Sequence, residues 1–73
     1  MDIIDLTGDV CPLGIYRARI HLGKLGPGER IEFLMKPGDQ IRSVPSSIRE
    51  DGYRIDRIWR DGEVFHVLAG RAA

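Results

Sequence analysis

The 73-residue chain is poor in cysteine and histidine, and each shortage excludes a class of function. Its single cysteine, Cys11, rules out an internal disulfide and a two-cysteine redox motif, which fits a reducing, cytoplasmic setting. The two histidines, His21 and His66, stand apart in the sequence and show neither a metal-binding spacing nor a placement as base for Cys11. We therefore expect no metal and no bound cofactor, and both histidines are interpreted as solvated or edge residues.

Long apolar runs and an excess of charge of one sign are also absent. No stretch approaches the roughly 20 apolar residues that span a bilayer, and the N-terminus lacks the basic and apolar regions of a signal peptide. Eleven basic and eleven acidic residues cancel, so the net charge gives no reason to expect a nucleic-acid or membrane partner. At this length we expect one domain over residues 1–73, and a monomer.

The first half of the chain divides into a strand, a helix and a second strand. A short apolar strand over residues 2–6 precedes the turn at Gly8. A helix should run from Pro12 to about Lys24, because the following Gly-Pro-Gly segment cannot continue it. Residues 30–35 alternate as a half-buried strand, with these side chains inward: Ile31, Phe33 and Met35.

The second half predicts a broken helix and a hairpin. Asp39 is a candidate N-cap, but Pro45 interrupts the helical spacing, so we expect a kink and then a short helix over residues 45–51. Strands over 53–59 and 64–69 are joined by Asp61-Gly62, a strong hairpin signal. The predicted fold is α+β, a two-layer βαβαββ sandwich with a four-stranded mixed sheet and both helices on one face. The other face should carry to solvent Glu32, Arg54, Asp56 and Arg60.

The first helix carries two apolar stripes, and only one of them can pack on a sheet. The stripe that continues to the helix end is interpreted as core: Ile15, Ala18, Leu22 and Leu25. The second stripe, flanked by Arg17, should be partly exposed and is a candidate docking surface: Leu13, Tyr16 and Ile20. The alternative is incidental exposure, which is common in small domains.

Cys11 lies in the predicted connection between the first strand and the first helix. Gly8 can turn the chain, and Pro12 suits the first position of a helix. A sulfur just before a helix faces unsatisfied N–H groups and the positive end of the helix dipole, which favour the thiolate. The alternative is a buried, inert cysteine. A reactive thiol without a base, a second cysteine or a substrate pocket suits a carrier that accepts a group from one protein and passes it to another.

Four segments resemble the TusA/SirA-like family of small sulfur carrier proteins, in order along almost the whole chain. They are Asp5-x-x-Gly8-x-x-Cys11-Pro12, Leu25-x-Pro27-Gly28-Glu29, Val44-Pro45 and the Asp61-Gly62 turn. The chain departs from the family's Cys-Pro-x-Pro motif at Gly14, where the second proline is missing. The resemblance implies the same βαβαββ sandwich, with Gly8 and Pro12 presenting the thiol. Gly14 also belongs to the segment that presents it, and it loosens the first helical turn.

The resemblance also implies a role for Cys11. It would carry a persulfide sulfur received from a cysteine desulfurase or a rhodanese and pass it to an acceptor protein. In this family the acceptors serve tRNA thiolation, molybdenum cofactor synthesis or sulfur oxidation. Such a carrier is not an enzyme in its own right. The alternative is a regulatory or binding module on the same scaffold, with Cys11 as a redox sensor or incidental.

Overall fold

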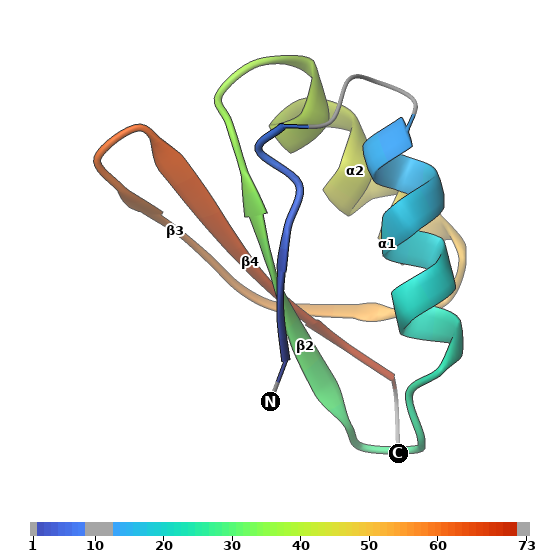
Figure 1. Ribbon diagram of the computed structural model, residues 1–73. Coiled ribbons are helices and arrows are strands. Elements are labelled where there is room, and N and C mark those ends of the chain that lie inside the picture. The colour runs from blue at the N-terminus through green and yellow to red at the C-terminus, as the bar shows by residue number, and fades with distance from the viewer. Residues whose placement is uncertain (1, 9–12, 72–73) are drawn as a thin grey trace.

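The structure, a computed structural model, describes residues 2–8 and 13–71 of the chain (Figure 1). Its elements follow the order βαβαββ, as the sequence predicts. They are β1 (Asp2–Asp5), α1 (Leu13–Gly23), β2 (Arg30–Met35), α2 (Asp39–Glu50), β3 (Arg54–Asp61) and β4 (Val64–Gly70). Within the described residues, neither helix has the length and hydropathy that crossing a membrane would need.

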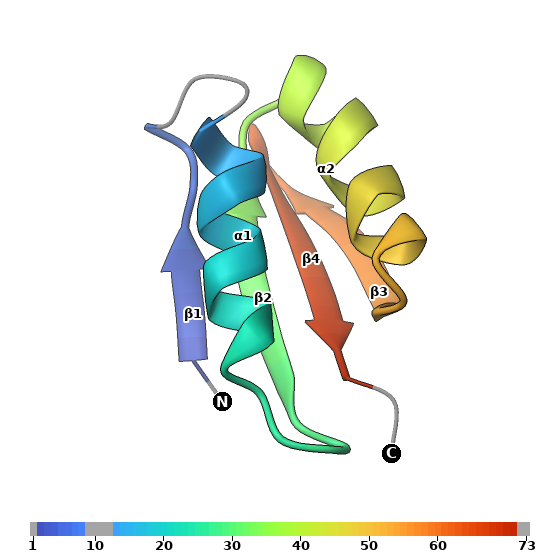
Figure 2. The ribbon, with the colours of Figure 1, turned by 90° about the vertical axis from the view of Figure 1, so that its right-hand side faces the viewer.

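The four strands form one mixed sheet in the order β1-β2-β4-β3. β1 and β2 are parallel and are connected through α1, whereas β4 is antiparallel to both of its neighbours. Figure 2 shows α1 and α2 lying side by side over one face of the sheet. The predicted fold class, a two-layer sandwich with both helices on one face, is therefore confirmed.

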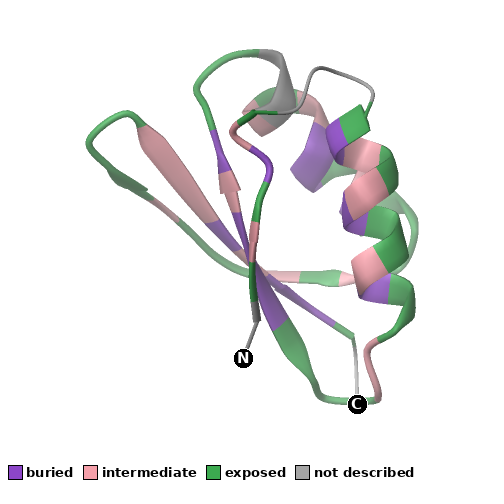
Figure 3. Ribbon diagram, viewed as in Figure 1, coloured by how far each residue is buried: buried purple, intermediate pink, exposed green. Residues whose placement is uncertain are grey.

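The core lies between the sheet and the two helices (Figure 3). Alternation along β2 turns Ile31, Phe33 and Met35 toward the helices, and each is at most 2% exposed. Ala18 and Leu22 of α1 are fully buried against them, so the predicted core face of this helix is confirmed. The remaining buried core residues are Leu6, Val44, Ile48, Val67 and Ala69.

The helix α2 is continuous through Pro45, so the predicted kink with a short helix over 45–51 is wrong. Proline removes one backbone hydrogen bond inside a helix and disfavours its continuation. Here Val44 and Ile48, on either side of the proline, are at most 1% exposed in the core. Their burial on the sheet offsets the missing hydrogen bond and holds the helix in one piece.

The start of α2 also differs from the expectation that Asp39 caps it. Asp39 is already the first helical residue, and the cap position is Gly38 with φ of 122°. A positive φ of this size is open to glycine and costly for other residues. The backbone freedom of Gly38, rather than a capping side chain, therefore sets the entry into the helix.

A β-bulge in β3 changes which side chains face solvent. The register with β4 shifts between Ile55 and Arg57, so that side-chain alternation changes phase along the strand. Arg60 consequently lies opposite Phe65 on the helix side, with its guanidinium 5.4 Å from the Phe65 ring centroid. The prediction that the open side of the sheet carries Arg60 is wrong for this reason.

Glu32 and His66 correct the expectation that both would be solvated. Glu32 is only 9% exposed, and its Oε2 lies 2.9 Å from His66 Nδ1 on the neighbouring central strand β4. The His66 ring stacks on Trp59 with centroids 4.9 Å apart and planes 8° from parallel. Side-chain contacts between β2, β4 and β3 therefore shield from solvent a carboxylate and an imidazole that lie far apart in the sequence.

Gly70 is expected to be intolerant of even one methyl group. A Cβ there would lie 2.8 Å from Arg30 Cγ and 2.9 Å from the Glu29 carbonyl oxygen. Gly70→Ala should therefore lower the free energy of unfolding by about 1–3 kcal/mol, because the backbone at Glu29 must move. Urea denaturation measures this change. Gly23→Ala is the matched control, since nothing lies within 4 Å of its added methyl. An equal loss in both variants would contradict the expected clash.

Candidate functional site

The predicted reactive residues Cys11 and Pro12 lie outside the described residues. The structure describes the chain on both sides of them. Gly8 ends the segment that follows β1, and Leu13 begins α1, so Cys11 stands two positions before the helix in sequence. The first turn of α1 carries no acidic side chain, so within it no carboxylate competes for the helix N-terminus.

The turn that leads from β1 toward Cys11 is held by Asp5. Its Oδ1 accepts hydrogen bonds from the backbone N–H of Thr7 at 2.8 Å and from the Thr7 hydroxyl at 2.5 Å. Arg17 Nη1, on α1, donates to the Asp5 carbonyl oxygen at 3.5 Å. Aspartate is suited to such a local turn because its short side chain reaches the backbone two residues on. Asp5, the first residue of the Asp-x-x-Gly-x-x-Cys-Pro signature, therefore holds the turn that precedes the segment containing Cys11.

The same contacts lower the pKa of the Asp5 carboxyl below its usual 3.8, with the Thr7 hydroxyl as the largest cause, then the Thr7 N–H and the charges of Arg17 and Lys36. Thr7→Val should raise this pKa toward 3.8, whereas Thr7→Ser should leave it low. Because the folded value is depressed, the stability that Asp5 contributes is present above the unfolded pKa and is lost as the pH falls through the folded one. Carboxyl chemical shifts followed by NMR during an acid titration measure both variants. The same pKa in both variants would contradict this assignment.

The second apolar stripe of α1 is exposed, as the sequence predicts. Leu13, Tyr16 and Ile20 are 47%, 54% and 58% exposed, and they begin two residues after Cys11. We call these three residues the α1 stripe. Arg17, beside it, is half-buried, and Gly14 is buried in the first turn of the helix. The described surface of α1 therefore offers an apolar strip that begins at the cysteine segment.

The two histidines occupy separate parts of the fold. His21 lies in the last turn of α1, at the end of the helix remote from Leu13. His66 is engaged by Glu32 and Trp59 on the side of the sheet away from the helices. The two histidines therefore lie on opposite sides of the sheet.

The structure also shows a surface hollow that the sequence did not predict. It measures about 460 Å³ and is lined by Thr7, Lys36, Pro37, Glu63 and Val64. The ends of β1 and β2 meet the β3–β4 turn there, and such a meeting of distant segments leaves no local sequence pattern. The hollow borders Thr7, on the chain that leads into the cysteine segment.

Comparison with known proteins gives consistent matches. Residues 2–69 match the family model described as sulfurtransferase TusA. A protein from Archaeoglobus fulgidus, provisionally named a sulfur carrier protein, is 24% identical over 62 residues, which cover 85% of this chain and 70% of that protein. The crystal structure of a SirA-like protein from Desulfitobacterium hafniense superposes with a TM-score of 0.80, at 26% identity and over the full length of both chains.

Proposed function

The chain belongs to the TusA sulfurtransferase family, and on that premise we propose that it carries sulfur as a persulfide on Cys11. The observation that carries the proposal is the family match over residues 2–69, which spans the opening signature and the only cysteine of the chain. A single thiol is sufficient for a carrier, because it needs neither a resolving cysteine nor a bound cofactor.

The loading step is a thiol–persulfide exchange. The Cys11 thiolate attacks the outer sulfur of a donor persulfide, the donor S–S bond breaks, and the donor leaves as a thiolate. The transferred sulfur becomes the outer atom of a Cys11 persulfide, and delivery to the acceptor repeats the exchange in the other direction. The positive end of α1, with no acidic residue in its first turn, favours the anionic forms of both thiol and persulfide.

Donor and acceptor are proteins in this proposal. A cysteine desulfurase or a rhodanese supplies the sulfur, and an acceptor in tRNA thiolation, cofactor synthesis or sulfur oxidation takes it. Each partner would contact the α1 stripe and Arg17, because an exposed apolar strip beside an exchanging thiol gives an area that partners can bury. The chain is then a co-substrate of its partners rather than an enzyme, and a reducing cytoplasm would keep its thiol unpaired.

Loading tests this proposal. The reduced protein is incubated with a cysteine desulfurase and cysteine, and its intact mass is then measured. We expect a gain of one sulfur atom that dithiothreitol reverses, and no gain in Cys11→Ser. Failure of the wild-type protein to load from several desulfurases and rhodaneses, or equal loading of Cys11→Ser, would contradict the proposal.

A further inference from the structure

The face of the sheet that α1 and α2 leave uncovered has an ordered apolar centre. Strand register places on it side chains that alternate with the core residues: Ile3, Glu32, Leu34, Trp59, His66 and Leu68. We call this surface the open face. Ile3 is 60% exposed, and Leu34, Trp59 and Leu68 are partly exposed. The open face is thus a mixed apolar and aromatic surface that no element among the described residues covers.

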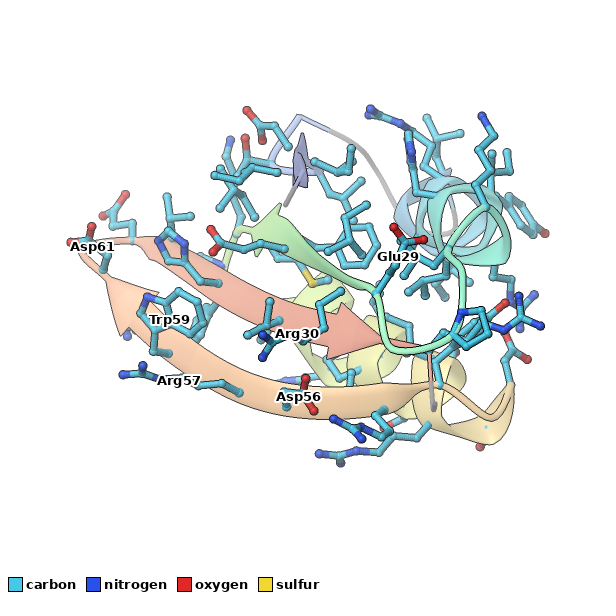
Figure 4. All side chains as sticks on the ribbon, turned by 90° about the horizontal axis from the view of Figure 1, so that it is seen from below. Glu29, Arg30, Asp56, Arg57, Trp59 and Asp61 are labelled. Atoms are coloured by element: carbon cyan, nitrogen blue, oxygen red, sulfur yellow. The ribbon has the colours of Figure 1, made fainter. Side chains whose placement is uncertain are left out.

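Four side chains across the open face hold one another in place. Glu32 pairs with His66 at 2.9 Å, His66 stacks on Trp59 at 4.9 Å, and the Arg57 guanidinium carbon lies 5.0 Å from the Trp59 ring centroid. Figure 4 shows Trp59 and Arg57 next to each other along β3. Side chains ordered before association lose little rotamer freedom on docking, and tryptophan and arginine are the residues that most often dominate interfaces.

The open face is basic at one end. Arg30 and Arg54 both lie opposite Gly70, at the start of β2 and of β3. Asp56 interacts with both, at 3.9 Å from Arg30 and 2.9 Å from Arg54. The Arg57 guanidinium lies further along the face, over Trp59. One carboxylate between two guanidiniums leaves this end positively charged.

The open face is acidic at the other end. Asp61 lies opposite Val64 at the end of β3, and Asp5 lies opposite Leu34 at the end of β1. Glu63 and Lys36 line the hollow beside Val64. Figure 4 shows Asp61 at the hairpin end of β3 and Arg30 toward the other end of the sheet. Three carboxylates against Lys36 and the Arg17 guanidinium, which both act on Asp5, leave this end negatively charged.

We propose that the open face is a self-association surface that takes a second copy of this chain. A two-fold axis between two facing sheets, running across the strands, sets the basic end of each copy over the acidic end of its partner. The same arrangement brings the apolar centres together. A partner with charge of one sign would leave one end of the face facing like charge, so a second copy is the better match.

Net charge agrees with this occupant. Eleven positive and eleven negative residues leave two copies with no net repulsion. Both helices lie on the other face of the sheet, so such a dimer leaves the α1 stripe of each copy accessible. The inference is therefore independent of sulfur transfer. A monomer is the expectation from sequence, which carries no signal of this face.

Sedimentation equilibrium of the full chain in reducing buffer tests the inference. The mass should rise with concentration from 8.2 kDa toward twice that value, and added salt should oppose the rise. Arg54→Glu and Asp61→Arg should each raise the dimer dissociation constant at least tenfold, because each sets like charges opposite one another. An equimolar mixture of the two variants should dimerise again, since every reversed charge then meets its opposite.

Each other outcome overturns the inference. A protein that stays monomeric up to millimolar concentration has no such surface. A dimer insensitive to both charge reversals uses another surface, and variants that fail to complement each other in the mixture exclude the two-fold arrangement. Asp61→Asn controls for the turn, and thermal melts of all variants establish that they are folded.

Discussion

Phe33→Ala is expected to leave a large fraction of the protein unfolded at 25 °C. Phe33 is fully buried at the centre of β2, where it lies between Ile4 of β1 and Val67 of β4. Truncating a buried phenylalanine costs about 3–5 kcal/mol, through lost transfer free energy and the cavity left behind. A single core in a domain of this size supplies about 3–5 kcal/mol of net stability, so one substitution removes nearly all of it. Circular dichroism and urea titration measure the loss.

Tyr16→Ala is the matched control for this prediction. It also truncates an aromatic side chain, but Tyr16 is 54% exposed on the α1 stripe and lies away from the core. Surface substitutions of this kind change the free energy of unfolding by about 0.5 kcal/mol or less. A Phe33→Ala protein as stable as Tyr16→Ala would show that the core is not centred on β2.

Replacing Tyr16 and Ile20 together with glutamine is expected to weaken loading by the donor at least tenfold. Both side chains are more than half exposed on the α1 stripe, and burying one such residue contributes about 1.5–3 kcal/mol to association. Loss of binding alone raises the KM of the donor enzyme for this carrier. Its kcat should stay the same, because neither side chain exchanges sulfur. Steady-state desulfurase kinetics with the variant as acceptor separate the two parameters.

Ile58→Gln is the control for the stripe substitution. Ile58 is also an exposed isoleucine, at 42%, but it lies on β3 rather than on α1. Its replacement should leave both kinetic parameters unchanged. Equal effects of the two changes, or a fall in kcat without a rise in KM, would contradict a docking role for the α1 stripe.

Periodicity predicted the parts of the fold that depend on one element at a time. The alternation of β2 indicated Ile31, Phe33 and Met35 as core, and the stripes of α1 separated Ala18 from Tyr16; the structure confirms each assignment. These predictions succeed because a side chain's direction follows from the helical or strand period alone. Glycine and proline indicated the turns, because their backbone preferences are likewise local properties of single residues.

Features that depend on contacts between two distant segments could not be predicted from the sequence. The bulge between Ile55 and Arg57 is set by pairing with β4, and it reverses the face expected for Arg60. The Glu32–His66 contact joins residues 34 positions apart, so neither residue predicts the other. The break predicted at Pro45 is wrong: local propensity favours a break there, but burial of Val44 and Ile48 keeps the helix continuous.

The sequence predicted the helix and the exposed stripe that flank the candidate site. The sequence indicated Cys11 as a lone thiol before a helix, and the structure begins that helix at Leu13 with the α1 stripe exposed. The role of Asp5 in holding the preceding turn was not predicted, although an aspartate two residues before a threonine is a recognisable turn signal. The residues that form each charged end of the open face come together only through strand pairing, so no pattern along the chain predicts them.

Cyanolysis of the loaded protein tests the central claim most directly. After loading from a desulfurase and removal of the donor, cyanide takes the outer sulfur of a persulfide as thiocyanate and leaves the Cys11 thiolate. We predict one equivalent of thiocyanate per wild-type chain and none from Cys11→Ser carried through the same procedure. No thiocyanate from the wild-type protein, or the same yield from both proteins, would show that Cys11 does not carry sulfur.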